Sequence, residues 1–391
     1  MRINKYPDAD LQRRSDLATS LKYGAKAPAP PTAKGTYAEN IPFPAGLAPT
    51  PKPIVPAPKP DAALPGADVI AMMDTTAEAA AMADVLTPGH RPTTWYPYAK
   101  NFTAKFLPQI GPDGPSRESH RLGSYFITEI GKLKVLVYKT ELHMHEDAKK
   151  LPDGSYTLPI KDMFKQMIAD AKPSVFLTTG TAGGVYCSMH LGDVMVSRAA
   201  EFYCQKDFAS APFNHQKFQS KWAVPDSYVA AAEKLMQGFA GHLTGQTEPH
   251  GTPPNPDCAC SGPGYPTNIY YDGTHDIPAF HPILTTDFFE FGTSTNNLEK
   301  LGMAVEMDDA CLGLACSEIK SPPQWACVRN ASDPAINGKL AYSLQENCAE
   351  YYYTKFGYWT TVMSALATWA IIAGLGGTTH KRARRGGVSR R

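Results

Sequence analysis

The chain has 391 residues, of which 43% are hydrophobic, and this supports one large domain or two ordinary ones. Its net charge is +1 at pH 7, so the chain as a whole offers no broad electrostatic field to nucleic acid, and we expect no nucleic-acid partner. Proline is abundant, with 35 residues, and much of it lies in one segment near the N-terminus.

The first 66 residues are predicted to form an N-terminal extension (1–66) with a proline-rich linker. Residues 1–23 are compatible with a short helix, and nothing in them suggests chemistry. Residues 24–66 repeat Ala-Pro and Lys-Pro steps, which favour extended polyproline conformations and forbid helix, so we expect a linker or a strap over the surface. The N-terminus has no apolar core, so we expect no signal peptide and a cytoplasmic location.

A single folded domain is predicted over residues 67–378. The run ADVIAMM is typical of a strand, and the Ala-rich segment that follows it begins with threonine and is typical of a capped helix. Two β-rich runs on either side of Ile130-Gly131-Lys132 predict a hairpin. The next elements are predicted as a helix over 161–174, a strand over 175–179 that ends in a glycine turn, and a strand over 193–203.

The second half of the domain contains an insert at about 245–275, which is rich in Gly, Pro and Asn and long enough for a lid or a surface excursion. Around it we predict a helix over 225–243, a strand within 281–292, a helix, short strand and helix within 296–319, and a strand over 325–333.

An uncharged segment, residues 356–375, is about long enough to cross a bilayer. Because it contains Thr, Ser and Gly and follows a polar stretch that suits the same helix, we expect a buried helix and no membrane partner; a membrane anchor is the alternative. Residues 379–391 form a basic tail that we expect to be solvated.

Strands that alternate with helices predict an α/β sheet between helical layers. In such sheets, ligands bind at the carboxyl ends of strands. Three predicted strand ends present carboxylates, one presents aromatic rings and one a bare backbone pocket, with these residues: Asp74, Glu78, Asp287, Phe288, Phe289, Glu290, Glu306, Asp333 and the glycine run 180–184. This set suits a polar ligand with a flat ring, such as a nucleoside.

Four motifs in this order resemble the nucleoside phosphorylase/nucleosidase superfamily: GTAGG (180–184), GDVMVS (192–197), VEMDDACLGLAC (305–316) and VRNASD (328–333). The family shows G-S/T-A-G-G, G-D-hydrophobic-V-S, V-E-M-E-A-A and V-R-x-x-S-D. The resemblance covers about 67–375 and implies a phosphorylase/hydrolase-like three-layer fold, with a central twisted mixed sheet flanked by helices. It leaves residues 1–66 and the insert unexplained, and Asp308-Asp309 and Pro334 depart from the family pattern.

The resemblance also implies roles for individual residues. Asp333 resembles the general acid that protonates the purine at N7, and Glu78 resembles the carboxylate that activates water. The implied substrate-binding residues are Glu306 for the ribose hydroxyls, Met307 against the sugar, Phe289 stacked on the base, Gly180, Thr181 and Gly183 at the nucleophile site, and, as a weaker candidate, Glu290 at a base edge. An acid near the leaving base and carboxylates near the sugar suit this chemistry, because glycosidic cleavage builds negative charge on the base and positive charge on the sugar.

The family divides according to what attacks the sugar. Its phosphorylases carry phosphate-holding arginines in a Gly-Asp-Pro-x-Arg loop after the first strand and just before the glycine turn, and neither is present here. The sequence TGTAGG is closer to the methylthioadenosine/S-adenosylhomocysteine nucleosidases. We therefore expect hydrolysis of a purine or thio-purine nucleoside. The alternatives are a phosphorylase that uses Arg198 or Arg121, with phosphate in place of water as co-substrate, and a non-catalytic nucleoside-binding or sensor protein. Self-association into a homo-oligomer is implied as well.

The eight cysteines form no pattern typical of small secreted domains, and most lie in apolar runs, where a free cysteine behaves as a small hydrophobe. Cys258 and Cys260 are the only close pair, and a zinc site would need two more ligands. His143 and His145 alternate along the chain, and we expect them to be exposed or at the edge of the substrate. We therefore predict no metal and no cofactor.

Overall fold

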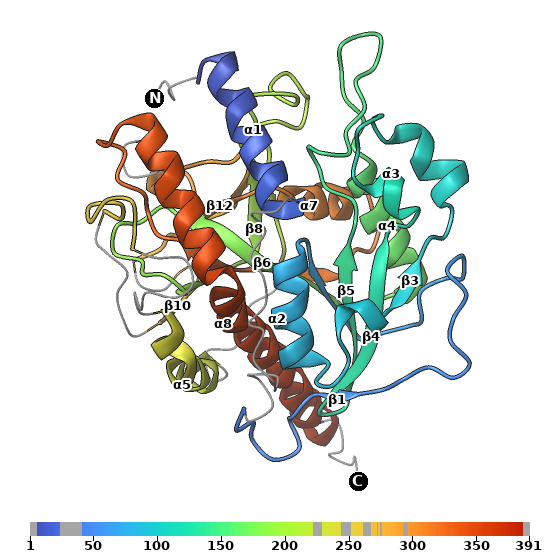
Figure 1. The fold of residues 1–391 in the computed structure, drawn as a ribbon. Helices are drawn as coiled ribbons and strands as arrows, with labels where there is room; N and C mark the ends of the chain where they lie inside the picture. The colour runs from blue at the N-terminus through green and yellow to red at the C-terminus, as the bar shows by residue number, and fades with distance from the viewer. Residues whose placement is uncertain are drawn as a thin grey trace.

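The computed structural model describes residues 6–23, 41–221, 229–243, 252–260, 267–271, 273, 276–291 and 296–385, without the side chains of 376–385. Within these ranges the predicted α/β class is confirmed, because one mixed sheet of 13 strands is flanked by helices (Figure 1). Linker residues 24–40, much of the insert at 245–275 and tail residues 386–391 lie outside the described residues.

The sheet combines parallel and antiparallel neighbours in the order β1-β4-β5-β2-β6-β12-β11-β8-β9, and β13 pairs with both β6 and β7. β3 pairs with β4, and β10 pairs with β7. The strands are β1 (Thr50–Pro51), β2 (Val69–Met73), β3 (Tyr96–Tyr98), β4 (Gly123–Ile130), β5 (Leu133–Thr140), β6 (Val175–Gly184), β7 (Val194–Ser197), β8 (Ala199–Phe202), β9 (Lys217–Gln219), β10 (Ile269–Tyr271), β11 (Ile283–Thr285), β12 (Ala304–Glu306) and β13 (Gln324–Asp333).

The helices cover both faces of this sheet. They are α1 (Asp8–Tyr23), α2 (Thr76–Leu86), α3 (Ser116–Ser119), α4 (Pro159–Ala171), α5 (Val229–Phe239), α7 (Asp309–Ser317) and α8 (Tyr342–Arg385), together with the shorter turns η1 (Pro92–Thr94), η2 (Phe102–Phe106), η3 (Leu107–Gln109), η5 (Ala240–Leu243) and η6 (Leu298–Lys300).

The three layers follow from the alternation of side chains along the buried strands. In β2, Val69, Ala71 and Met73 point to the core shared with α2 and α8, whereas Ile70 and Met72 point to the core shared with α4 and α7. Successive strand side chains point to opposite faces, so a strand that is apolar at every position must be covered on both sides. The central strands therefore position the sheet inside a sandwich of helices.

Local sequence signals place the first strand, helix and hairpin as predicted. Thr75 caps α2, and its side chain and that of Glu78 form a reciprocal capping box. The hairpin of β4 and β5 turns at Gly131, whose φ of 62° is a conformation that glycine adopts without strain.

Three predicted elements differ from the structure. The glycine run is not a turn, because β6 continues through Gly184 and its glycines pair with β13 and β12. The strand predicted over 193–203 is two strands, β7 and β8, separated at Arg198. The first helix predicted within 296–319 is only the short turn η6.

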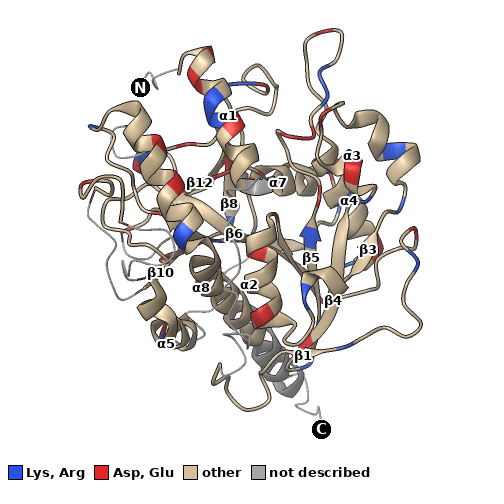
Figure 2. Cartoon of the chain, in the orientation of Figure 1, with Lys and Arg blue, Asp and Glu red and all other residues tan. Residues whose placement is uncertain are grey.

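Helix α8 packs through the middle of one core, as predicted for residues 356–375. Within the described residues, Tyr342–Leu375 is the one helix that is long and apolar enough to span a membrane by length and composition, and 89% of its most apolar window is buried in the protein. In Figure 2 the charged residues of Tyr342–Leu375 lie before residue 356, and residues 356–375 contain no Lys, Arg, Asp or Glu. Thr368 is hydrogen-bonded to Thr179 of β6 at 2.8 Å, and Tyr358 donates to Asp84 of α2 at 2.5 Å. These contacts are those of a core helix.

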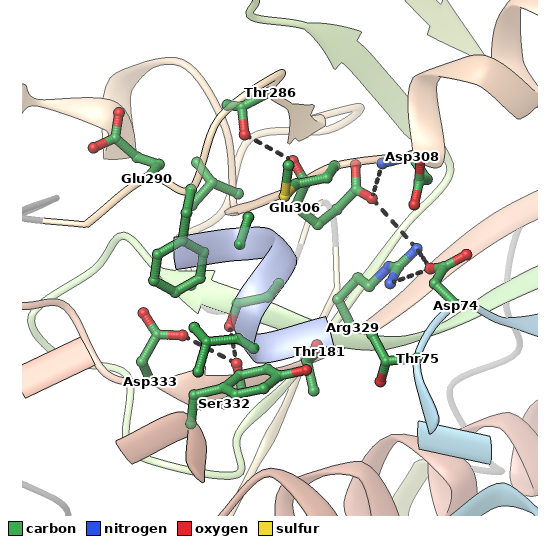
Figure 3. A pocket seen from close by; sticks show the side chains of 18 of the residues that line it. Asp74, Thr75, Thr181, Thr286, Glu290, Glu306, Asp308, Arg329, Ser332 and Asp333 are labelled. Atoms are coloured by element: carbon green, nitrogen blue, oxygen red, sulfur yellow. Dashed lines mark hydrogen bonds and ion pairs between the residues drawn. The ribbon is translucent and has the colours of Figure 1, made fainter. Parts of the chain in front are cut away.

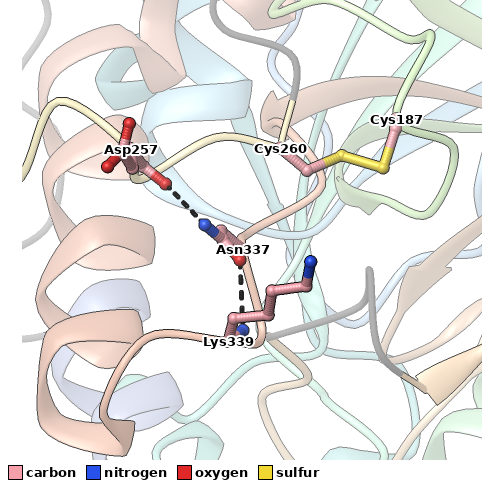
Figure 4. Close-up of a disulfide and its surroundings, with 5 residues drawn as sticks. All are labelled: Cys187, Asp257, Cys260, Asn337 and Lys339. Atoms are coloured by element: carbon pink, nitrogen blue, oxygen red, sulfur yellow. Dashed lines mark hydrogen bonds between the residues drawn. A yellow bond between two sulfur atoms is a disulfide. The ribbon is translucent and has the colours of Figure 1, made fainter.

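Four of the eight cysteines form disulfides, which corrects their interpretation as small hydrophobic residues. Cys187, just after β6, is bonded to Cys260 (Figure 4). Cys258 is bonded to Cys348 of α8. The segment around Cys258 and Cys260 also pairs with the backbone of residues 335–337, directly after β13. Disulfides persist mainly in oxidising compartments. They do not support the cytoplasmic location, which stays a prediction.

A thiol titration checks this pairing. Protein purified without reductant and denatured is expected to expose four reactive thiols, those of Cys204, Cys311, Cys316 and Cys327. Reduction before titration raises the count to all eight cysteines of the chain. Eight thiols in the unreduced sample would contradict both bonds.

Candidate active site

One cavity collects the carboxyl ends of the central strands and brings together most of the predicted site residues (Figure 3). Its volume is about 60 Å³. Eight of the nine predicted site residues line it: Glu78, Thr181, Gly183, Phe289, Glu290, Glu306, Met307 and Asp333. The other lining residues are Ala18, Leu21, Asp74, Thr75, Ala182, Thr286, Val305, Asp308, Arg329, Ser332 and Tyr353. Eight predicted residues therefore share one cavity, while their roles stay predictions.

Gly180, the ninth predicted residue, lies behind the cavity wall. A Cβ at this position would come within 2.5 Å of Glu78 Oε1 and 2.9 Å of Arg329 Nη1. The glycine therefore allows two charged side chains to approach the strand backbone more closely than any other residue would permit.

Gly180→Ala is expected to lower the free energy of unfolding by about 1–3 kcal/mol, because overpacking a buried site costs this much. Urea unfolding measures the change. Gly238→Ala in α5 is the control: a Cβ there meets nothing within 4 Å. This exposed helical position should gain about 0.5–1 kcal/mol from the better helix former. Equal effects at the two sites would contradict the close approach at Gly180.

Glu78 uses its whole carboxylate to connect α2 to the glycine-rich end of β6. Oε2 accepts from the backbone amides of Asp74 (2.9 Å) and Thr75 (2.7 Å). Oε1 accepts from the amide (2.7 Å) and hydroxyl (2.6 Å) of Thr181. A carboxylate offers about four acceptor positions. The structure thus gives Glu78 a clear positioning role, and its predicted role as the base stays a prediction.

Arg329 of β13 is the cation of the site, and the sequence analysis did not assign it a role. Its guanidinium is 2% exposed and contacts Asp74 at 3.1 Å, Asp309 of α7 and Glu306 at 3.4 Å. A charged residue inside an otherwise apolar strand must find partners, because an unpaired buried charge is strongly unfavourable. That rule, applied to VRNASD, is the signal that points to Arg329.

Asp74 is a second carboxylate that the sequence placed at a strand end without a role. Oδ2 accepts from Arg329, while Oδ1 is buried without a hydrogen-bond partner among the described residues. Burial raises the pKa of Asp74 to about 7, with Arg329 opposing the rise. Asp74 is therefore a weakly acidic carboxyl beside Thr75 and Glu78, with acceptor capacity to spare.

Glu306 ends β12 and holds the start of α7. Its carboxylate accepts from the hydroxyl of Thr285 and from the amides of Asp308 (2.6 Å) and Asp309 (2.9 Å). Burial and the neighbouring Asp309 raise its pKa well above the usual range. These protein donors occupy the oxygens that the resemblance assigns to ribose, so the sugar-binding role of Glu306 stays a prediction.

Asp333 lies at the other end of the cavity, where β13 ends (Figure 3). Its Oδ1 accepts from the hydroxyl of Ser332 at 3.0 Å. Burial raises the pKa of Asp333 to about 7. A Cβ built on Gly183 would lie 3.2 Å from Asp333 Oδ2 and 3.7 Å from the carbonyl oxygen of Glu290, which places Asp333 close to the Phe289-Glu290 segment. A carboxyl that titrates near pH 7 is suited to donate a proton at neutral pH.

The other candidates from the sequence lie outside the cavity lining. Arg121 pairs with Glu141 at 2.7 Å, and Arg198 stacks over the ring of Phe280. His143 is fully buried 3.1 Å from Asp308, which corrects the expectation of an exposed position, while a position at the edge of the substrate stays a prediction. Within the described residues, no group of three or more His, Cys, Asp or Glu side chains is placed to hold a metal ion.

The N-terminal helix α1 supplies Ala18 and Leu21 to the cavity wall. This corrects the expectation that residues 1–23 have no connection with chemistry. The sequence carries only a weak signal that α1 packs against the domain. Leu17 and Leu21 lie four residues apart, so they share one face of the helix, and both are buried.

Comparisons with known proteins find no matching family model and no matching curated protein. Solved structures do match over 78% of this chain. They include the 5′-methylthioadenosine/S-adenosylhomocysteine nucleosidase from Neisseria meningitidis (13% identity, 99% of that chain, TM-score 0.45), a putative nucleosidase of the same name from Borrelia burgdorferi bound to adenine (14%, 98%, 0.45) and the futalosine hydrolase of Helicobacter pylori (13%, 97%, 0.42). These proteins belong to the superfamily that the four motifs resemble, and the match is one of structure at low sequence identity.

Proposed function

We propose that this protein hydrolyses the N-glycosidic bond of a purine or thio-purine nucleoside. The observation that carries the proposal is the cavity itself, which has an acidic group with a pKa of about 7, Asp333, at the end near Phe289, and a cluster of carboxylates around Arg329 at the other. The two ends match the two charges that develop when the bond breaks, negative on the base and positive on the sugar.

Asp333 is the proposed general acid. Its proton passes to the purine as the bond to the sugar breaks, so the base leaves as a neutral molecule. Phe289 offers a ring beside it, and aromatic rings stack on flat heterocycles. On the sugar side, Glu306 and Asp308 line the cavity, and their carboxyl groups would lie near the carbon that becomes electron-poor.

Water is the proposed nucleophile because the described lining residues leave no cation to hold phosphate. Arg329 is the sole Lys or Arg among these described residues, and Asp74, Asp309 and Glu306 already surround it. A phosphate dianion would meet several carboxylates and no unpaired positive charge. The phosphorylase alternative is therefore not favoured.

Glu78 and Asp74 are the two candidates for the base that activates water. The resemblance favours Glu78. The free acceptor capacity favours Asp74, because each oxygen of Glu78 already accepts two hydrogen bonds whereas Asp74 Oδ1 accepts none among the described residues. Comparing Glu78→Gln with Asp74→Asn separates them: the folded variant with the larger loss of kcat at unchanged KM identifies the base.

The direct test incubates purified protein with inosine, adenosine and methylthioadenosine, with and without phosphate. Hydrolysis predicts release of free base and free sugar at a rate that phosphate does not change. Ribose 1-phosphate among the products would reject hydrolysis in favour of phosphorolysis.

A nucleoside-binding protein without turnover is the second candidate. It is favoured by the saturation of Glu306 with protein donors. Tight nucleoside binding without base release, unchanged by Asp333→Asn, would establish it. Self-association also stays a prediction, which sedimentation of the purified protein can check.

A further inference from the structure

The cavity is too small for the proposed substrate as the structure stands. Its volume is about 60 Å³, which is room for a few water molecules. Pockets that bind small organic molecules usually measure about 300–1,000 Å³. A nucleoside can occupy this site only if one of the walls moves.

Helix α1 is the wall that is least tied to the rest of the fold. The strand walls are held by the hydrogen-bonded ladders of the sheet, and Tyr353 belongs to the buried helix α8. In the described part of the chain, no backbone–backbone hydrogen bond joins α1 to another element. Its ribbon crosses the cavity between Glu306 and Asp333 in Figure 3, and it is held there by side chains.

Arg14 is the main side-chain anchor of α1. Its Nη1 donates to Glu290 Oε1 at 3.0 Å and lies 3.3 and 3.4 Å from the carbonyl oxygens of Phe289 and Phe291. Its guanidinium stacks over the rings of Tyr6 (4.0 Å) and Phe291 (3.8 Å). Both charged side chains are almost completely buried, with exposed fractions of 2% for Arg14 and 1% for Glu290.

This arrangement would serve equally well to bind a heterocycle. A guanidinium is flat, stacks on aromatic rings and presents N–H donors side by side. The N1–H and 2-amino group of a guanine-type base present the same donors on a flat ring. Glu290 Oε1 accepts from Arg14 and from the hydroxyl of Tyr6 at 2.8 Å, and its carboxylate can accept in the same way from the edge of such a base. Asp333 lies close to this segment.

We propose that α1 is an intramolecular competitor of the substrate, with Arg14 occupying the carboxylate of Glu290 that would otherwise bind the donor edge of a guanine-type purine. This inference rests on the function proposed above and narrows its substrate class. Seating of α1 and binding of the nucleoside exclude each other, so the apparent affinity is reduced by the fraction of molecules in which α1 is displaced.

The test uses the full-length chain carrying Asp333→Asn, so that cleavage does not interfere with binding. Arg14→Gln is added to it, and the matched control is Arg13→Gln, one residue away. Arg13 is 54% exposed in its pair with Glu346. Hydrogen exchange reports the seating of α1, and calorimetry with guanosine and adenosine reports binding.

Arg14→Gln should speed amide exchange in α1 and tighten guanosine binding by about 5- to 150-fold, the usual range for coupling between two binding events. Arg13→Gln should change neither. Leu21→Asp, which removes α1 from the cavity side without altering Glu290, should reproduce both effects. Glu290→Gln should also free α1 but lose the preference for guanosine over adenosine.

Two results would overturn the proposal. One is faster exchange in α1 with guanosine binding unchanged, weakened or absent, which would show that displacing α1 opens no nucleoside site. The other is unchanged exchange in both α1 variants. Failure of the hydrolase function looks different: guanosine binds tightly to the Arg14→Gln protein, yet the same variant with Asp333 restored releases no base.

Discussion

Asp333→Asn is expected to lower kcat for base release by about 10²–10⁴-fold, the usual contribution of a positioned general acid. The amide fills the same space and keeps a hydrogen bond with Ser332, but it has no proton to give to the leaving base. Steady-state release of base from inosine measures the loss. Asp257→Asn, at an exposed position away from the cavity, is the control and should keep full activity.

The pH dependence of activity gives a second test of Asp333 as the general acid. Because burial raises the pKa of Asp333 to about 7, the carboxyl is protonated below this pH and ionised above it. Activity should therefore fall about tenfold for each pH unit above about 7. The Asn variant should lose this descending limb. A variant that keeps more than a tenth of the activity, or keeps the limb, would remove Asp333 from the mechanism.

Arg329→Met should have the largest effect on stability. The substitution removes the cation shared by Asp74, Glu306 and Asp309 and leaves these carboxyls buried together. Breaking a buried ion pair by removing one partner typically costs about 3–5 kcal/mol. Urea unfolding at pH 7 measures it, with Arg121→Met as the control. Arg121 is 41% exposed in its pair with Glu141, and exposed pairs contribute at most about 1 kcal/mol.

The loss in Arg329→Met should shrink in acid. Burial already raises the pKa of Asp74 and Glu306, so in the folded state they bind protons more readily than in the unfolded chain. Such groups favour the folded state as the pH falls from about 7 toward 4. Protonation therefore removes the repulsion that the missing arginine leaves. Two results would contradict the role of Arg329 as the cation shared by these carboxyls. One is a loss in the free energy of unfolding below about 1 kcal/mol at pH 7, and the other is a loss that is larger in acid than at pH 7.

The sequence allowed the sheet and the position of the cavity to be predicted because both depend on local signals. A few adjacent residues are enough to predict each of three features: the Thr75 cap, the turn at Gly131 and the apolar strands. β2, β6 and β13 run parallel and bring their carboxyl ends to one edge, so Glu78 and Asp333 had to converge if these strands were right. Glu306 joins them from β12, which pairs antiparallel with the glycine end of β6.

The parts that could not be predicted depend on contacts between distant segments. Arg14 meets Glu290 across 276 positions, and Cys258 meets Cys348 across 90. In neither pair do the neighbouring residues in the sequence predict which distant residue will be the partner. The continuation of β6 through its glycines was missed for a related reason: the glycines pair with β13 and β12, which lie more than 100 residues away in the sequence.

Helix α8 has a consequence for the way the protein is made. It lies beyond all 13 strands in the sequence, yet it packs against β6, β13 and α2 and supplies Trp369, the largest completely buried side chain. Until α8 has been synthesised, the face of the sheet that it shares with α2 remains partly uncovered and open to misassociation. The tertiary packing of this face is therefore expected to be completed only after α8 leaves the ribosome.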